Sequence, residues 1–482
     1  MNNHHIEARR SPQRRLVAAA IAALLVVDVS GAGERSFLPS MLPFANPSGL
    51  SATVSSKGEI DVTGPFFQDL GTNDRACVTC HQPSTGWTIT PHQVQARFEA
   101  SGGTDPIFRT NDGSNSPNAD VSTVDARRRA YSMLLAKGLI RVGIGVPSNA
   151  EFELVDVDDP YGHASAQELS LFRRPLPSTN LKFLSTVMWD GRETFRDPDS
   201  RSCILGTATC FASIHFDLAD QANGATMGHA ASARALTAQE REQIVDFETS
   251  LFTAQIFDDE AGQLTARQGR GGPRYLGDQP FYFGINDVVS GDYRTGTPFD
   301  AEVFMLYGAW NMVDRGGEDG GRSEARRAVA RGETLFNHKS IRITGVKGLN
   351  DDLGVPALDG TCTTCHDAPN AGNHSIPAPL DIGLADASRR TADLPLYTLR
   401  HKQPPFERVQ TTDPGRALIT GKWTDIGRFK GPVLRALASR APYFHNGSAG
   451  NLDAVVDFYD QRFAIGLSEA EKADLVAFLR AL

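Results

Sequence analysis

Hydrophobic residues recur at the three-to-four-residue spacing of an amphipathic helix in several segments of the chain. The segments, with the apolar residues that mark them, are 126–138 (Tyr131, Leu134, Leu135), 237–256 (Ile244, Phe247, Leu251, Ile256) and 468–482 (Leu475, Val476, Leu479, Leu482). The last two begin with capping boxes, Thr237-Ala-Gln-Glu240 and Ser468-Glu-Ala-Glu471, whose side chains satisfy free N–H groups of the first turn. A further helix is expected over 323–336. Strand signals are few and short, so we predict a mostly α fold with long irregular loops.

Stretches rich in glycine, proline and serine indicate how the chain is divided. Residues 34–60 predict an extended lead-in, and the run Gly-Gly-Glu-Asp-Gly-Gly predicts a linker over 316–322. This linker would separate an N-terminal domain over 61–315 from a C-terminal domain over 323–482, within the two or three domains that 482 residues can form. The Gly-, Asn- and Ser-rich stretch 101–124 predicts a long irregular loop that carries function or packs on a cofactor.

The N-terminus has the order of a signal peptide, with basic residues, then an apolar run, then small residues. Four arginines within residues 9–15 precede the apolar run 16–27, and small residues follow at 30–33. The run is shorter than the about 20 residues that span a membrane, although an uncleaved N-terminal anchor stays open as an alternative. We therefore expect a signal peptide over 1–33, export to the periplasm and no membrane attachment after cleavage.

The charge balance indicates ordinary solubility. The formal net charge is −9 at pH 7, with basic and acidic residues mixed along the chain. A protein that binds nucleic acid would instead be expected to carry a basic patch. We therefore expect no nucleic-acid partner.

The pattern Cys-x-x-Cys-His occurs twice. The two copies are Cys77-Val-Thr-Cys80-His81 and Cys362-Thr-Thr-Cys365-His366. In c-type haem attachment the two thiols form thioethers with the haem vinyl groups, and the adjacent histidine ligates the iron. A zinc site is the alternative, but its second cysteine pair usually lies within about twenty residues of the first, and these copies are far apart. The sequence therefore predicts two covalently bound haem c groups, one in each domain.

Two cysteines remain outside these motifs. Cys203 and Cys210 lie seven residues apart in a chain that is expected to be exported. Because an oxidising compartment favours disulfides, we predict a bridge between them that acts as a local staple.

The second haem needs a ligand opposite His366. Electron-transfer cytochromes often use methionine there, but none of the seven methionines follows His366 in the sequence. The candidates that remain are His374, His401, His445, a tyrosine or water.

Several blocks that surround the two motifs resemble the bacterial di-haem cytochrome c peroxidase and MauG superfamily. The matching blocks are Trp189-Asp-Gly-Arg192, Arg331-Gly-Glu-Thr-Leu-Phe336, Phe429-Lys-Gly-Pro-Val-Leu-Arg435 and Ala441-Pro-Tyr-Phe-His-Asn-Gly447. No match is found for 82–170. The resemblance implies a peroxide-reactive N-terminal haem domain and an electron-transferring C-terminal haem domain.

The resemblance also implies a ligand for the second haem. In the peroxidases a methionine follows the last block, and its position falls at Tyr459 here, where MauG-type enzymes have tyrosine. An anionic phenolate would stabilise ferric over ferrous iron. The alternative is that Tyr459 packs in a core beside Phe458 and that His401 or His445 is the ligand.

For the first haem the resemblance implies an open position opposite His81. The histidine that can cap this iron in the peroxidases falls at Arg97, which has no lone pair for a metal, and His92 is the nearest imidazole. Gln221 matches a distal glutamine, but the glutamate expected about ten residues later is missing. His229 is the nearest titratable group, so we expect it to be the acid–base catalyst for peroxide, with a structural histidine as the alternative.

Two further roles follow only from the resemblance. Trp189 matches a tryptophan between the haems, where an easily oxidised indole could relay oxidising equivalents; a buried core tryptophan is the alternative. Backbone carbonyls of Arg440 and Pro442 match those that bind a calcium ion, for which oxygen ligands are suited.

The expected function is that of an exported di-haem peroxidase that reacts with hydrogen peroxide at the His81 haem. Oxidising equivalents would be shared through Trp189 with the His366/Tyr459 haem. Electrons would come from a small c-type cytochrome or cupredoxin. The alternatives are a MauG-like oxidation of a protein substrate and a non-catalytic di-haem electron carrier.

Overall fold

The computed structural model describes residues 36–194, 214–312 and 320–482. The expected signal peptide (1–33) and the expected Cys203–Cys210 disulfide lie outside these ranges. Within the described residues no helix is long and apolar enough to cross a membrane.

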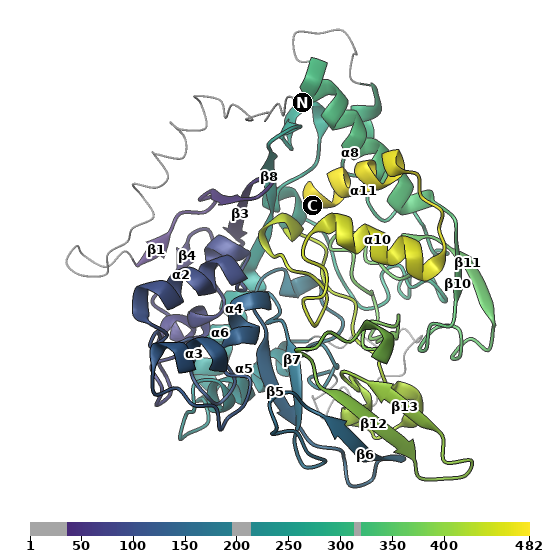
Figure 1. The fold of residues 1–482 in the computed structure, drawn as a ribbon. Coiled ribbons are helices and arrows are strands. Elements are labelled where there is room, and N and C mark those ends of the chain that lie inside the picture. The colour runs from purple at the N-terminus through teal and green to yellow at the C-terminus, as the bar shows by residue number, and fades with distance from the viewer. Residues whose placement is uncertain (1–35, 195–213, 313–319) are drawn as a thin grey trace, which may run out of the picture.

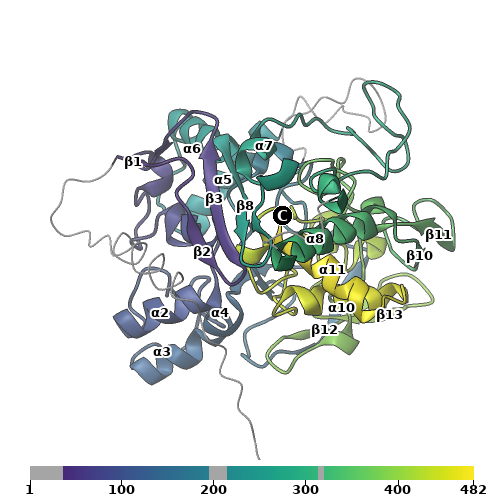
Figure 2. The same cartoon turned by 90° about the horizontal axis from the view of Figure 1, so that it is seen from above.

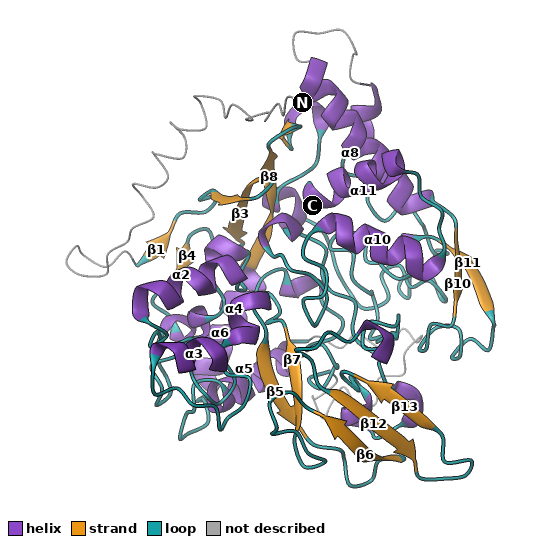
Figure 3. Cartoon of the chain, in the orientation of Figure 1, coloured by secondary structure: helices purple, strands orange, loops and turns teal. Residues whose placement is uncertain are grey.

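Helix is more abundant than strand, at 32% against 17%, and much of the chain lies in turns and loops (Figure 3), so the expectation of a mostly α fold is not confirmed. The α-helices are α2 (Pro91–Ser101), α3 (Val124–Ala130), α4 (Ser132–Lys137), α5 (His215–Gly228), α6 (Ala238–Ser250), α7 (Pro273–Gly277), α8 (Gly320–His338), α9 (Ala417–Thr420), α10 (Leu452–Phe463) and α11 (Glu469–Arg480). The strands are β1 (Phe37–Leu38), β2 (Phe44–Asn46), β3 (Gly49–Ser55), β4 (Ile60–Asp61), β5 (Ile140–Ile144), β6 (Phe152–Asp158), β7 (Leu169–Arg173), β8 (Leu251–Asp258), β9 (Gly262–Gln263), β10 (Ile341–Thr344), β11 (Ala357–Gly360), β12 (Leu396–His401) and β13 (Arg408–Thr411).

Small antiparallel sheets connect distant parts of the sequence. The largest has the order β2-β3-β8-β9, and its central pair sets Thr53 opposite Thr253. A second has the order β13-β12-β6, so a strand from the expected N-terminal domain pairs with one from the expected C-terminal domain (Figure 1). The two halves of the chain are therefore joined by backbone hydrogen bonds.

The capping boxes are confirmed, but one helix is shorter than its pattern suggests. Thr237 caps α6 and Ser468 caps α11, each with the reciprocal glutamate contact. The expectation that Leu251 and Ile256 continue α6 is wrong, because both belong to strand β8. This apolar stretch pairs with β3 and is buried in the sheet. The tertiary contact therefore determines its conformation, although the spacing of its apolar residues predicts a helix.

Two other helical segments differ in detail from the pattern. The segment 126–138 forms two short helices, α3 and α4, which meet at Tyr131. The helix expected over 323–336 is longer, Gly320–His338, so the end of the expected linker 316–322 is its first turn. The residues of that linker before Gly320 lie outside the described ranges.

Helices α8, α10 and α11 form a compact group around one core, seen together in Figure 2. Gly332 lets α8 and α11 approach closely, because a Cβ there would lie 2.0 Å from the carbonyl oxygen of Asp474. Arg331 pairs with the Asp474 carboxylate at 2.7 Å, and the buried Glu333 accepts a hydrogen bond from the N–H of Tyr307 at 2.9 Å. The Arg-Gly-Glu block therefore fixes how these helices pack.

Candidate functional site

The two Cys-x-x-Cys-His motifs form the same local structure. Each begins with a single 3₁₀ turn, Cys77–Thr79 in the first copy and Cys362–Thr364 in the second. In each, the histidine N–H donates to the carbonyl of the first cysteine, at 3.0 and 3.1 Å. The threonine before the second cysteine accepts from the backbone N–H that precedes the motif, at 3.0 and 2.9 Å. The spacing therefore produces one turn with both thiols on it.

Each motif histidine is oriented by a carbonyl six residues further along. Nδ1 of His81 donates to the Trp87 carbonyl at 3.0 Å, and Nδ1 of His366 donates to the Gly372 carbonyl at 2.6 Å. A proton held on Nδ1 leaves Nε2 as the lone-pair nitrogen, which is the arrangement of a metal-ligating imidazole. The residues present therefore fit a haem iron at both histidines.

The acceptor residue has a left-handed backbone in both copies, with φ of 61° at Trp87 and 67° at Gly372. Glycine is suited to this conformation, and a Cβ at Gly372 would lie 2.8 Å from the Phe304 ring. Trp87 is instead held by complete burial and by its indole N–H, which donates to the Thr53 hydroxyl at 2.9 Å. Strand β3, which carries Thr53, thereby supports the first motif.

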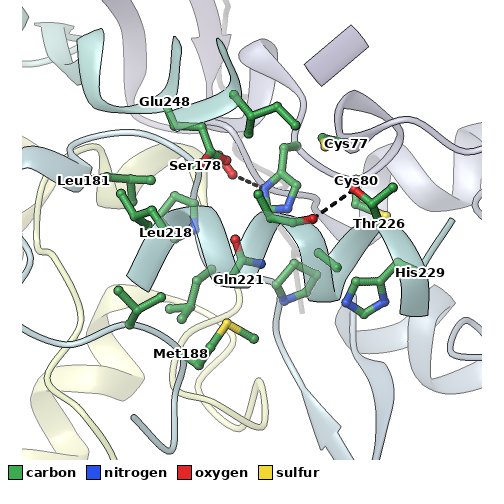
Figure 4. A pocket seen from close by; sticks show the side chains of 18 of the residues that line it. Cys77, Cys80, Ser178, Leu181, Met188, Leu218, Gln221, Thr226, His229 and Glu248 are labelled. Atoms are coloured by element: carbon green, nitrogen blue, oxygen red, sulfur yellow. Dashed lines mark hydrogen bonds between the residues drawn. The ribbon is translucent and has the colours of Figure 1, made fainter. Parts of the chain in front are cut away.

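A cavity of about 180 Å³ lies against the first motif (Figure 4). It is lined by the motif residues Cys77, Cys80 and His81 and by three residues singled out in the sequence, Trp189, Gln221 and His229. Gln221 and His229 are set two helical turns apart, on α5 and just beyond its end, and Ala225 between them also lines the cavity. One face of α5 therefore forms the wall that carries both.

His229 is part of a charged chain that the sequence did not reveal. Its Nδ1 donates to a carboxylate oxygen of Asp112, whose other oxygen accepts from Arg75 at 2.5 Å. Burial alone would raise the pKa of Asp112, but the hydrogen bond from His229 and the charge of Arg75 keep it below its usual value. Asp112 lies in the irregular stretch 101–124, so this loop does reach the cavity.

The other residues considered for the first haem do not reach the cavity. Arg97 pairs with Asp105 and donates to the Thr79 carbonyl at 2.6 Å, which gives it a structural role beside the motif. His92 is exposed, and neither it nor Arg97 belongs to the cavity lining.

Met188 and Glu248 line the cavity without having been expected there, and burial raises the pKa of Glu248 to about 7.

A second cavity of about 220 Å³ lies against the second motif. Its lining contains Cys362, Cys365, His366 and three of the candidate ligands, Tyr459, His374 and His445, among aliphatic and aromatic side chains. Tyr459 lies on α10 and is half-buried in the lining of this cavity. Burial raises the pKa of this phenol, so a phenolate there would need a cation beside it.

The histidine candidates separate into two groups. His401 does not line the second cavity; its Nδ1 lies 3.1 Å from the Gln403 carbonyl. His445 lines the cavity and stacks on Phe429 at 4.0 Å between ring centroids, and neither of its ring nitrogens has a partner among the described residues. His374 lines the cavity and is buried as well.

The two cavities share one wall. The residues that line both are Arg174, Pro175, Leu176, Pro177, Trp189, Lys430 and Val433. The indole N–H of Trp189 donates to the Arg174 carbonyl at 2.8 Å, and the Lys430 N–H donates to the Trp189 carbonyl at 2.9 Å. Trp189 is therefore fixed on both sides, in the wall between the cavities.

Of the expected calcium ligands, the Arg440 carbonyl accepts a hydrogen bond from the Arg174 guanidinium at 3.0 Å. Pro442, the other expected ligand, lines the second cavity. Among the described residues no group of three or more His, Cys, Asp or Glu side chains converges as a metal-ion site would require. The calcium ion stays a prediction.

The chain matches no family model. It is 34% identical over 140 residues to the cytochrome-c peroxidase IdrP1 of Pseudomonas sp. (strain SCT), covering 25% of this chain and 36% of that protein. It is 32% identical over 126 residues to the cytochrome c peroxidase Ccp of Escherichia coli (strain K12), covering 26% and 23%. It is 42% identical over 65 residues to the methylamine utilization protein MauG of Methylorubrum extorquens, covering 11% and 18%.

The matched regions thus span about a third or less of these relatives. Among solved structures, a MauG-like protein associated with microbial copper homeostasis aligns over 94% of both chains, at 15% identity and a TM-score of 0.36.

Proposed function

We propose that this chain belongs to the superfamily of bacterial di-haem cytochrome c peroxidases and MauG, and that it is an exported oxidoreductase that consumes hydrogen peroxide. The observation that carries the proposal is the pair of equivalent motif turns, each facing its own cavity, with Trp189 in the shared wall. Cys77, Cys80 and His81 would hold one haem c, and Cys362, Cys365 and His366 the other. Bound haem would supply an iron centre that reacts with peroxide and stores oxidising equivalents.

In the first cavity His229 would move the proton that peroxide cleavage requires. Its Nδ1–H is held by Asp112, so Nε2 is free to take a proton and to return it. The charge of Asp112 stabilises the imidazolium that forms, and Arg75 keeps Asp112 ionised. The His229 side chain is 42% exposed, so it can exchange its proton with solvent between turnovers. Gln221 would complete the polar wall on α5.

In the second cavity Tyr459 would be a further ligand of the haem iron that His366 holds. Its position in the cavity lining with Cys362, Cys365 and His366, among aliphatic and aromatic side chains, supports this role. A metal cation would offset the burial that disfavours the phenolate. His374 and His445, which line the same cavity, are the competing ligands.

Trp189 would pass electrons between the cavities. Its indole N–H donates to a backbone carbonyl, which cannot take up a proton, so the ring would keep its proton while it gains or loses an electron. This arrangement supports a relay that needs no proton transfer at each step.

The source of electrons distinguishes two versions of this function. A small c-type cytochrome or cupredoxin would serve a peroxidase that removes peroxide. Tyrosine ligation favours the second version, in which a protein substrate is oxidised, because an anionic oxygen ligand stabilises oxidised iron. Either version places the protein in the periplasm after removal of residues 1–33.

Stopped-flow absorbance tests the proposal with the ferric holoprotein and one equivalent of hydrogen peroxide, without reductant. We expect the absorbance of both haems to change together and the oxidised state to persist. A protein that reacts only after pre-reduction would contradict the shared oxidation and the Tyr459 ligand. Oxidation of added reduced cytochrome c, or its absence, then separates the two versions.

A further inference from the structure

Two neighbouring arginines that line the first cavity, Arg173 and Arg174, have opposite surroundings. Arg173 is paired with two buried carboxylates, Asp190 at 2.6 Å and Asp413 at 2.7 Å. Arg174 bonds only to backbone carbonyls, among them those of Ile89 at 2.7 Å and Arg440 at 3.0 Å. Arg173 is buried, but the carboxylates of Asp413 and Asp190 raise its pKa. Arg174 has no such partner, and burial lowers its pKa to about 9.

Two more buried cations belong to the same region, Arg440, whose carbonyl accepts from Arg174, and Lys430, which lines both cavities as Arg174 does. The Arg440 guanidinium donates to the carbonyls of Val433 at 2.8 Å and Arg435 at 2.7 Å. Lys430 is 5% exposed, and its ammonium group has neither a hydrogen bond nor an ion pair among the described residues. Burial and the charge of Arg440 lower the pKa of Lys430 to about 7. We call Arg174, Lys430 and Arg440 the cationic cluster; within the described residues none of the three is paired with a carboxylate.

This arrangement is unfavourable unless an anion completes it. A buried charge without a counter-charge costs several kcal/mol, and like charges nearby add to the penalty. Arg174 and Lys430 line both cavities, and Arg440 lines the second. The missing negative charge must therefore come from whatever occupies the cavities.

We propose that the cationic cluster binds carboxylates of the prosthetic groups, namely haem propionates from both cavities, and so couples the two sites electrostatically. The inference rests on the proposed function, because it requires haem in both cavities. Haem is the group with carboxylates that the two motif turns imply. Because haem is amphipathic, its polar propionate edge needs polar partners inside a pocket that is otherwise apolar. Guanidinium and ammonium groups are the usual partners of carboxylates.

The cluster also surrounds the proposed relay. Trp189 is held by the carbonyl of Arg174 and by the N–H of Lys430, so two of the three cations are bonded to it through their backbone. Unneutralised positive charge here would oppose oxidation of the indole. Propionates bound to the cationic cluster would neutralise this charge. The relay through Trp189 would therefore require haem in the cavities.

The test is a spectroelectrochemical titration of the purified holoprotein, comparing wild type with Lys430→Gln, Lys430→Arg and the exposed control Lys422→Gln. Haem content is measured first, because a protein without two haems would contradict the proposed function rather than the cluster. With two haems present, Lys430→Gln should lower both midpoint potentials, since a lost cation favours the more positive oxidised iron. Lys430→Arg should restore them, and Lys422→Gln should leave them unchanged.

Unchanged potentials in Lys430→Gln, with both haems present, would overturn the proposal. Wild-type potentials that depend on chloride or phosphate concentration in a saturable way would also overturn it, because the cluster would then hold a free anion. Should Lys430→Gln fail to fold, resonance Raman spectra of Lys430→Arg give a second measurement. The propionate bending bands should shift from those of wild type, and identical bands would overturn the proposal.

Discussion

The two cavities share an attachment turn and differ in the wall that faces it. Both present two thiols and an imidazole whose Nδ1 is bound by a carbonyl six residues later. Beyond this turn, the first cavity contains the charged chain His229–Asp112–Arg75, and the second contains Tyr459 among apolar side chains. In the proposed function, the motif would therefore determine where a haem is attached, and the rest of the fold would determine what that haem can do.

The strongest test of this comparison removes one attachment turn. The double variant Cys362→Ala/Cys365→Ala should lose one covalent haem completely and keep the other, because each turn is closed by its own hydrogen bonds. Intact-protein mass spectrometry and the pyridine haemochrome assay measure this directly. The matched variant Cys77→Ala/Cys80→Ala should show the same loss from the other site. Loss of both haems from either variant would mean that the turns are not independent.

The next test concerns the wall of the first cavity. His229→Ala should slow the reaction with peroxide by about 10²–10⁴-fold, the usual contribution of general acid–base catalysis. Asp112→Asn should have a smaller effect, because the amide oxygen can still accept the Nδ1–H hydrogen bond of His229 and only the charge that stabilises the imidazolium is lost. Stopped-flow absorbance of the ferric protein gives both rates. Tyr459→Phe is the control from the other cavity, and equal slowing by all three changes would contradict the division of roles.

The shared wall can be tested with Trp189→Phe. The first haem should react with peroxide at its normal rate, while the response of the second haem should be delayed by at least about tenfold, because phenylalanine is harder to oxidise. Transient absorbance that resolves the two haems measures the delay. Simultaneous responses in this variant would show that electrons pass between the cavities by another route.

The wall of the second cavity is tested by Tyr459→Phe. Loss of an anionic ligand should raise the midpoint potential of one haem and alter its low-spin electron paramagnetic resonance signal, while the other haem keeps its spectrum. His445→Gln serves as the comparison, since His445 lines the same cavity. If the spectrum responds to His445→Gln and not to Tyr459→Phe, the ligand is the histidine.

The smallest effect concerns the capped helices behind each cavity. Ile244 of α6 lines the first cavity and Leu475 of α11 lines the second. Thr237→Ala and Ser468→Ala each remove the N-terminal cap of one helix and should lower the free energy of unfolding by about 1 kcal/mol. Urea denaturation followed by circular dichroism measures both changes. A loss of haem binding, rather than of stability, would show that the caps do more than hold the helices.

What the sequence predicts well is local in the chain. The motif turns and the two capping boxes depend on residues near one another. The approach of Gln221 and His229 to the first motif joins distant segments, and it was expected only from the resemblance to a family. Strand β8 was mistaken for helix because its partner β3 lies about two hundred residues away, at Thr53 opposite Thr253.

Asp112, in contrast, gave no signal beyond its place in a long loop. Its carboxylate becomes recognisable only when folding sets it between Arg75 and His229. The cationic cluster is hidden for the same reason, because an arginine that pairs with carboxylates and one that does not look alike in a sequence. Arg173 and Arg174 are adjacent and differ in this way.

The left-handed residue at the end of each attachment turn also bears on the biogenesis of the protein. Segment 361–372 closes on Gly372, which adopts its conformation without help, so this turn can form in a chain that has not yet folded. Segment 76–87 closes on Trp87, whose left-handed backbone carries a strain of about 1–3 kcal/mol that contacts such as the hydrogen bond to Thr53 of β3 offset. Contacts close in sequence form before distant ones. We therefore expect the second turn to form before the first, which needs the N-terminal sheet, so that a haem would be attached at the second motif first.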